Sequence, residues 1–208
     1  MLQSNTRARS LSLVFVIAGF ISGIVLVVNA AKRAGILELS PVTQLVAPLA
    51  QVMAIGLIIG IFVATPAMRG RMGSVGVVLY VAALVALVGL EFVINLVFPY
   101  VAPEVIGELR GGPLGIAFLV TSVSFLLGSI IFFIALWRVS QSPKIAILVS
   151  VISSVPIALR TAFPEVALQI GLVGLAVGVS LLALWLLRVG RSSSVDMGSF
   201  VPKAVRTN

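Results

Sequence analysis

The 208-residue chain contains no histidine and no cysteine, and only 10% of its residues are charged. Without histidine and cysteine, the chain cannot form a histidine-containing catalytic triad, a thiol nucleophile, a Cys/His zinc site or a disulfide. Soluble domains carry about 25% charged residues, so this chain has less than half of the usual charge. We therefore expect a protein that is not water-soluble, is not an enzyme, and binds no metal and no cofactor.

What the chain has instead is long apolar runs, with 60% hydrophobic residues and a mean hydropathy of +1.24. A membrane core of about 30 Å needs roughly 20 apolar residues in a helix. These runs are continuously apolar, whereas the strands of a membrane barrel alternate, so we expect helices. The sequence predicts an all-α polytopic membrane protein, with a domain (1–188) made of a bundle of six transmembrane helices at about 11–31, 44–67, 74–98, 114–137, 145–163 and 166–187.

The basic residues are distributed unevenly over the connections between these runs. Cytoplasmic loops of membrane proteins carry an excess of Lys and Arg, which predicts that both termini are cytoplasmic. Ten of the 14 basic residues then lie on the cytoplasmic side: Arg7, Arg9, Arg69, Arg71, Arg138, Lys144, Arg188, Arg191, Lys203 and Arg206. Lys32, Arg33, Arg110 and Arg160 lie on the other side. Orientation and contact with the lipid bilayer explain the net charge of +8, so we expect no nucleic-acid partner.

The two ends of the chain support further predictions. Basic residues followed by an apolar run and by Val28-Asn29-Ala30 are also typical of a cleavable signal peptide. The run is longer than a signal core of about 7–15 residues, which favours a retained helix over the alternative of cleavage. Residues 189–208 are basic, contain Ser and Gly, and have few apolar residues, so they predict a disordered cytoplasmic tail.

Small residues four positions apart allow two helix backbones to approach closely in a membrane. Three of the predicted helices contain such helix-packing pairs, at Gly19 and Gly23, Gly56 and Gly60, and Gly174 and Gly178. Because the pairs are spread over three helices, they favour packing within one chain. An interface in a homo-oligomer is the alternative.

Glu91 is the only acidic residue within the apolar runs. A charge at the bilayer centre costs about 2.5–3.5 kcal/mol, so we expect Glu91 to face the protein interior. Its predicted partner is Arg160, because the two residues lie roughly 10 Å and 5 Å from the outer ends of their helices at 1.5 Å per residue; the alternative for Arg160 is snorkelling to the head groups. Asn95, one turn beyond Glu91, and Gln51 share this depth. The four residues predict an outward-facing polar cluster, with simple hydrogen bonding between helices as the alternative.

Several short motifs resemble a family of uncharacterised bacterial integral membrane proteins with six helices, a domain of unknown function. The motifs are Ala8-Arg9, Pro66-Ala67-Met68-Arg69, Glu91, Leu127-Gly128, and Trp137-Arg138 followed by Pro143-Lys144. The resemblance implies a multi-pass protein of the bacterial inner (plasma) membrane. It implies no activity and no catalytic residue, since the family has no settled function.

Two functions are consistent with these features. The first is a small carrier or ligand-binding membrane protein that uses the cluster around Glu91, where a carboxyl group within a span is a candidate for proton coupling. The alternative is a non-catalytic subunit or assembly partner of a larger membrane complex, in which the glycine faces contact another membrane protein. A lipid-modifying enzyme ranks last, because Glu91 is the only acid or base within the spans.

Overall fold

The structure, a computed structural model, describes the backbone of residues 2–160 and 162–196 and the side chains of residues 12–160 and 162–190. Every regular element in these ranges is helical, which confirms the predicted all-α fold. The α-helices are α1 (Leu2–Arg33), α2 (Pro41–Val46), α3 (Leu49–Ala64), α4 (Arg71–Phe92), α5 (Pro103–Gly111), α6 (Pro113–Trp137), α7 (Lys144–Ala158) and α8 (Glu165–Asp196). Short helical elements join some of them, namely η1 (Pro66–Met68), the π-helix η2 (Val93–Val97) and η3 (Phe98–Tyr100).

Five helical segments of the described chain are long and apolar enough to cross a membrane, judged by length and composition. They are Ser12–Arg33, Pro41–Ala64, Arg71–Tyr100, Pro113–Trp137 and Glu165–Gly190, and each overlaps one predicted span. These segments indicate a membrane protein. The predicted span at 145–163 is not confirmed, because its helix, α7, has only 15 residues.

α7 is shorter than the predicted span 145–163. Pro156 lies inside the helix and has no amide hydrogen, so it cannot bond to the carbonyl one turn earlier. Leu159 then leaves the helical conformation, at φ −102° and ψ 35°. The prediction of a helix as far as residue 163 is therefore wrong, and residues 159 and 160 form a turn that leads toward α8.

The second predicted span is interrupted near its start by Pro48, between α2 and α3. Proline cannot donate the helical hydrogen bond, which explains the break. Two side chains of α1 bond to carbonyl oxygens next to it. Asn29 Nδ2 donates to Ala47 O at 3.2 Å, and Ser22 Oγ donates to Ala50 O at 2.8 Å. The interrupted segment is thereby held against α1.

The six longest helices of the described chain form a closed ring. Each packs against the next in the order α1, α3, α4, α6, α7 and α8, and α8 packs back against α1. The most extensive contacts in the ring are those of α1 with α8 and of α4 with α6. The least extensive is that of α6 with α7. The ring is therefore tight on two sides and looser between α6 and α7.

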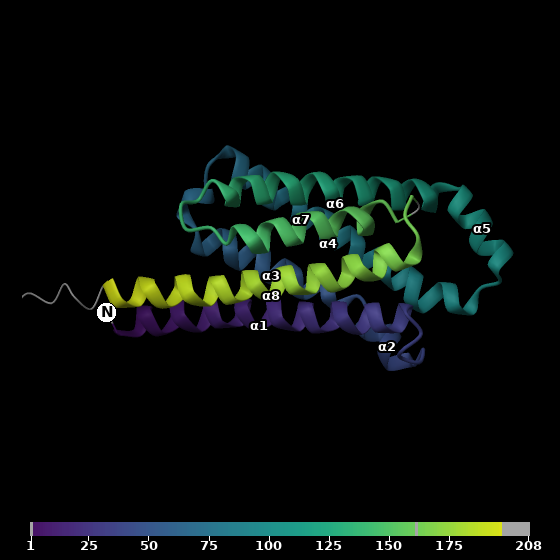
Figure 1. Cartoon of the computed structure of the whole chain (residues 1–208), viewed down its shortest axis with the longest axis horizontal. Coiled ribbons are helices and arrows are strands. Elements are labelled where there is room, and N and C mark those ends of the chain that lie inside the picture. Colours follow the sequence, from purple (N-terminus) through teal and green to yellow (C-terminus); the bar gives the residue numbers. More distant parts are fainter. Residues whose placement is uncertain (1, 161, 197–208) are drawn as a thin grey trace, which may run out of the picture.

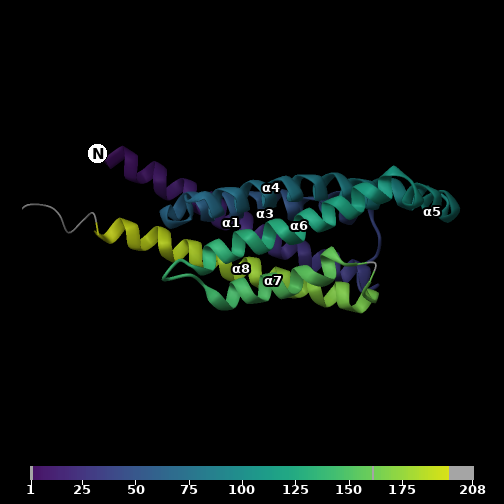
Figure 2. The same cartoon turned by 90° about the horizontal axis from the view of Figure 1, so that it is seen from above.

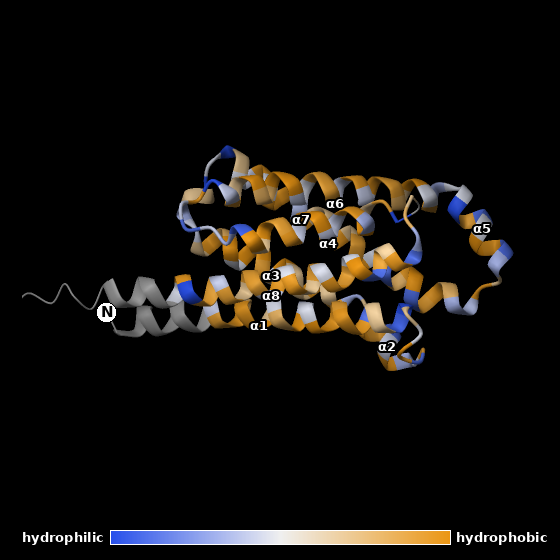
Figure 3. Ribbon diagram, viewed as in Figure 1, coloured by the Kyte–Doolittle hydropathy of each residue, from blue (hydrophilic) through white to orange (hydrophobic). Residues whose placement is uncertain are grey.

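The two ends of the bundle differ. The N-terminus lies at the same end as the α3–α4 and α6–α7 connections and the far end of α8, which we call the terminal end (Figure 1). α2 and α5 lie at the opposite end, the α5 end, where α5 projects beyond the bundle (Figures 1 and 2). Hydrophobic residues cover the helices along their length, and hydrophilic residues gather at the two ends (Figure 3). This distribution suits a bundle whose middle lies in a membrane.

The predicted glycine pairs face other helices of the same chain. Gly19 and Gly23 of α1 face α8, Gly56 and Gly60 of α3 face α1, and Gly174 and Gly178 of α8 face α7. A Cβ atom at Gly178 would lie 3.1 Å from backbone atoms of Ser150, closer than ordinary van der Waals contact. The six glycines therefore occupy helix contacts within the ring, as the preference for packing within one chain predicted.

The boundary of the predicted C-terminal tail differs from the structure. α8 continues to Asp196, so residues 189–196 are helical rather than disordered. They continue the helix because no Pro or capping turn separates them from the apolar part of α8. The rest of the predicted tail, 197–208, lies outside the described residues.

Candidate functional site

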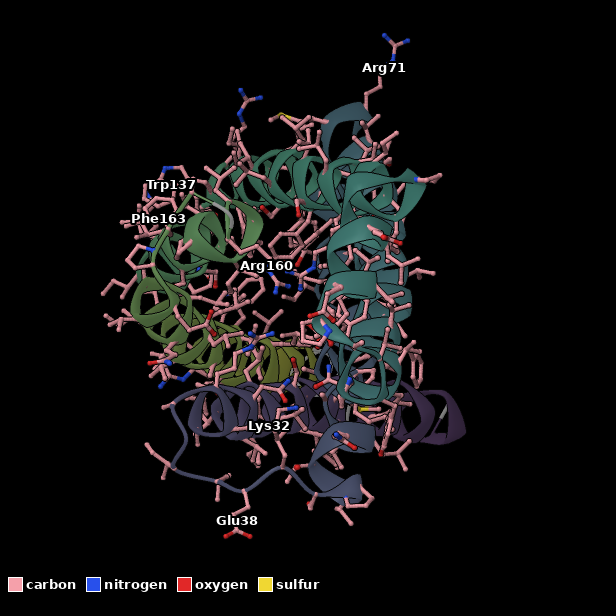
Figure 4. The ribbon with its side chains drawn as sticks, turned by 90° about the vertical axis from the view of Figure 1, so that its right-hand side faces the viewer. Lys32, Glu38, Arg71, Trp137, Arg160 and Phe163 are labelled. Carbon is pink, nitrogen blue, oxygen red and sulfur yellow. The ribbon has the colours of Figure 1, made fainter. Side chains whose placement is uncertain are left out.

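A cavity of about 80 Å³ lies inside the ring, in the half toward the α5 end. Residues from α1, α3, α4, α6, α7 and α8 contribute to its lining, together with η2 and the turn after α7. The four residues of the predicted polar cluster, Glu91, Arg160, Gln51 and Asn95, all line this cavity. Viewed from the α5 end, Arg160 lies in the middle of the ring and Lys32 lies at the edge formed by α1 (Figure 4). The structure thus brings together residues that are far apart in the sequence.

Asn95 connects a basic and an acidic side chain across the cavity wall. Lys32 Nζ donates to Asn95 Oδ1 at 2.5 Å. Asn95 Nδ2 in turn donates to Glu91 Oε2 at 2.7 Å and to the Glu91 carbonyl oxygen at 2.9 Å. Asn95 is only 6% exposed, so these bonds are sheltered from solvent. The three residues form a Lys32–Asn95–Glu91 chain that links α1 to α4 and η2.

The backbone geometry around Asn95 is unusual. α4 ends at Phe92, and the chain continues as the π-helix η2, which contains Asn95. π-helical turns are rare and occur frequently at functional sites. The side chain of Asn95 still reaches back to Glu91, as the sequence spacing predicted for an α-helical turn. The wider turn places both residues on the cavity wall.

Glu91 and Arg160 do not form the predicted ion pair. No carboxylate oxygen of the described residues lies within 4.0 Å of the Arg160 guanidinium. Arg160 Cζ instead lies 5.9 Å from the centroid of the Phe118 ring, a cation–π contact. Lys32 takes the place predicted for Arg160, because α1 extends to Arg33 and so brings Lys32 to the cavity wall.

Two amide side chains present unpaired acceptors. Gln51 Oε1 and Asn29 Oδ1 are both buried, and neither accepts a hydrogen bond from the described part of the protein. Both residues line the cavity. A buried polar atom without a partner costs about 1–3 kcal/mol, so such atoms generally meet water or a ligand. The cavity is large enough for either, since one water molecule needs roughly 10–15 Å³ of such volume.

A second set of contacts closes the ring between α1 and α8. Arg33 Nη1 and Glu165 Oε1 form a salt bridge of 3.1 Å, and Gln169 Nε2 donates to the Arg33 carbonyl oxygen at 3.2 Å. α1 ends here because Gly35 adopts a left-handed conformation, with φ 72°. These contacts fix the last turn of α1, which carries Lys32.

The inner wall of the cavity is mostly apolar, with Ser22 and Tyr80 as its polar residues. Leu26, Leu84, Phe125, Leu172 and Leu175 line it below the charged and amide residues, toward the middle of the bundle. A site with charged groups at one end and an apolar wall at the other suits a ligand that has both kinds of surface.

Lys32 and Arg33 were missed as site residues from the sequence, although a signal for them was present. Four basic residues lie on the predicted non-cytoplasmic side, where the charge rule does not require them. Three of the four, Lys32, Arg33 and Arg160, line the cavity. Basic residues that the orientation rule leaves unexplained were therefore the better guide to the site.

The chain was compared with models of protein families, with curated proteins and with solved structures, and no match was found. The resemblance to a bacterial membrane-protein family therefore stays a prediction, and the site has to be interpreted from its own geometry.

Proposed function

We propose that the chain is a six-pass protein of the bacterial plasma membrane that binds, and as a small carrier moves, a ligand in the cavity at its α5 end. Both termini then face the cytoplasm and the cavity faces outward, in agreement with the distribution of basic residues. α7, the shortest of the six spans, extends its reach through the turn that leads to α8. The role is binding rather than catalysis, because the chain has no His or Cys and a single acid within its spans.

The observation that carries the proposal is that all six ring helices wall one cavity that has both charged and apolar linings. Purely structural polar contacts between helices satisfy their own hydrogen bonds. Here the buried oxygens of Gln51 and Asn29 lack a protein partner in the described structure. Unpaired acceptors on the wall of a cavity support a binding role over a dry core.

The alternative role, as a subunit or assembly partner, depended on the glycine faces. Those faces contact α1, α7 and α8 of the same chain. The proposal of ligand binding is therefore the better supported of the two.

The experiment is cysteine accessibility, and the native chain is suited to it because it has no cysteine. Gln51→Cys is treated with a membrane-impermeant thiol reagent added outside intact cells. Glu38→Cys, which is exposed at the α5 end, is the positive control. Ser129→Cys, fully buried on α6 and away from the cavity lining, is the negative control. Arg71→Cys, exposed at the start of α4 and so at the terminal end, reports the orientation.

We expect Gln51→Cys to react at least tenfold faster than Ser129→Cys, and Arg71→Cys to react only after the cells are permeabilised. If Gln51→Cys stays as unreactive as Ser129→Cys while Glu38→Cys reacts, the cavity is closed to the outside and the proposed function is wrong.

A further inference from the structure

The basic residues at the α5 end gather around the interior, whereas most acidic residues there do not. Lys32, Arg33 and Arg160 line the cavity, and Arg160 also lines a second hollow together with Arg110. Exposed acidic residues, namely Glu38, Glu104 and Glu108, line neither space. Glu91 is the only acid on the wall of the cavity, and the second hollow has none among the described residues.

The second hollow is a groove of about 230 Å³ between α6 and the end of α7. Its apolar residues Leu119, Val123 and Leu159 are 65%, 44% and 41% exposed on the outer surface of the bundle. It lies where the ring is loosest, because α6 and α7 make the least extensive contact. In a bilayer this surface faces the acyl chains of lipids.

The groove and the cavity adjoin each other. Phe118, Ser122 and Arg160 line both of them. A molecule seated in the groove can therefore place one end at Arg160, at the boundary with the cavity, while the rest lies along the apolar surface of α6.

The charges on the cavity wall are not equally compensated. Glu165 pairs with Arg33 at 3.1 Å, and Glu91 is linked to Lys32 through Asn95. Arg160 has no carboxylate among the described residues within 4.0 Å. Glu91 and Glu165 act on Arg160 only from a greater distance, and Arg33 and Arg110 oppose them. A half-buried guanidinium without a direct carboxylate partner is costly and favours an anionic partner.

Arg110, on the other side of the groove, also lies over an aromatic ring. Arg110 Cζ lies 5.2 Å from the centroid of the Phe98 ring, as Arg160 Cζ lies over Phe118. Stacking on an aromatic face leaves the N–H groups at the edge of a guanidinium available. These planar groups match a carboxylate or a phosphate, to which arginine donates two parallel hydrogen bonds.

We propose that the cavity and the groove together bind an amphipathic anion, a carboxylate or phosphate head group attached to an acyl chain. The head group lies at Arg160, with Arg110 beside it, and the chain lies in the groove between α6 and α7. The ligand enters sideways from the outer half of the bilayer. This inference rests on the proposed function and names the class of its ligand.

The test is binding to the purified full-length protein in a neutral detergent, measured by native mass spectrometry. Four probes separate the contribution of the anionic head group from that of the acyl chain. Oleate and dioleoyl phosphatidate carry an anionic head on acyl chains and represent free fatty acids and phospholipids. Monoolein has the chain of oleate but no charge, and acetate has the charge without the chain. We expect one bound oleate or phosphatidate per chain, with a Kd at least tenfold lower than that of monoolein, and no retained acetate.

Two matched variants remove one arginine each. Arg160→Gln should weaken binding of the anionic probe at least tenfold and leave monoolein unchanged. Arg71→Gln, which removes the same charge from an exposed position at the terminal end, should leave both unchanged. The melting temperature of each variant shows that it is folded.

The outcomes distinguish this inference from the function on which it rests. If oleate, phosphatidate and monoolein bind equally, or if Arg71→Gln weakens binding as much as Arg160→Gln, the anion site is wrong. If at the same time Gln51→Cys is accessible from outside, the proposed ligand cavity stands with a different ligand class. If Gln51→Cys is inaccessible as well, both are wrong.

Discussion

The contact between α4 and α6 depends on two glycines that have reciprocal positions. A Cβ atom at Gly76 of α4 would lie 2.8 Å from the backbone nitrogen of Phe132, and one at Gly128 of α6 would lie 2.8 Å from that of Tyr80. The rings of Tyr80 and Phe132 pack together, with centroids 5.7 Å apart. This contact holds the helix that carries Glu91 against a helix that lines both the cavity and the groove. Gly76→Ala is therefore a direct test of the helix arrangement around the site.

The size of the stability change expected for Gly76→Ala follows from the distances between its new Cβ atom and the backbone of α6. Ordinary contacts of a Cβ atom lie at 3.4–4 Å, so the new methyl group at 2.8 Å forces the two backbones apart by at least several tenths of an ångström. Backbone atoms cannot rotate away as a flexible side chain can. Overpacking of this kind costs about 1–3 kcal/mol. Alanine recovers roughly 1 kcal/mol through its better helix propensity, so the overpacking cost has to exceed that gain for a net loss. Because the obstacle is backbone, we take the upper part of the overpacking range, about 2–3 kcal/mol, and expect Gly76→Ala to lower the free energy of unfolding by about 1–2 kcal/mol.

Gly89→Ala is the matched control in the same helix. No atom lies within 4 Å of a Cβ built at Gly89, and its φ is not positive. The methyl group then only improves helix propensity, and we expect a gain of about 0.5–1 kcal/mol. Thermal unfolding of both variants in the same detergent, followed by circular dichroism, measures the difference. At roughly 2–4 °C per kcal/mol for a chain of this size, the two melting temperatures should differ by about 3–12 °C, with Gly76→Ala the lower.

Equal melting temperatures for the two alanine variants would refute the reasoning, as would a more stable Gly76→Ala. Either result means that α4 and α6 lie further apart than the structure has them. The lining of the cavity by α4 and α6 would then differ from the one described above.

Three further predictions concern the polar contacts. Lys32→Met and Glu91→Gln should show a coupling of about 0.5–3 kcal/mol in a double-mutant cycle of unfolding, because Asn95 links the two side chains. Glu91→Gln and Arg160→Gln should couple more weakly in the same assay than Lys32→Met and Glu91→Gln, because no carboxylate of the described residues lies within 4.0 Å of Arg160 and Glu91 acts on it only from a greater distance; a stronger coupling would restore the ion pair that the sequence predicted. Ser22→Ala should cost about 0.6–1.7 kcal/mol in thermal unfolding, since it removes the buried bond from Ser22 Oγ to Ala50 O, and an unchanged melting temperature would contradict this bond.

Much of the fold could be predicted because the bilayer imposes strong constraints on sequence. Long apolar runs located five spans that overlap helical segments of the structure. The end of α7 could not be located in this way, because apolar residues continue past Ala158 while the backbone turns. Hydropathy measures whether a residue tolerates lipid, and it does not measure whether the helix continues.

The candidate site was predictable in its members but not in its contacts. Depth along each helix grouped Glu91, Asn95, Gln51 and Arg160, and all four line one cavity. Depth does not give the rotation of a helix, so the Glu91–Arg160 pair was wrong and Lys32 was overlooked. The order of helices around the ring decides which polar groups meet, and this order comes from contacts between distant segments.

Gly76 and Gly128 are a second example of contacts that the sequence of a single helix does not predict. Neither glycine belongs to a pair of glycines four positions apart, because Met72 and Tyr80 flank Gly76 at that spacing and Ser124 and Phe132 flank Gly128. Their role becomes visible only when α4 and α6 are placed side by side. A glycine motif within one helix therefore predicts some close helix contacts. Contacts made by single glycines on two different helices can be recognised only from the structure.

Protection of Gln51→Cys by a ligand tests most directly whether the cavity is a binding site. The variant is treated with the impermeant thiol reagent in the presence and absence of saturating oleate, with Glu38→Cys as the control for effects on the reagent itself. Bound oleate at Arg160 should slow the reaction of Gln51→Cys at least tenfold and leave Glu38→Cys unchanged. A Gln51→Cys that reacts at the same rate with and without oleate, in a protein that mass spectrometry shows to have oleate bound, would place the ligand elsewhere and contradict the proposed site.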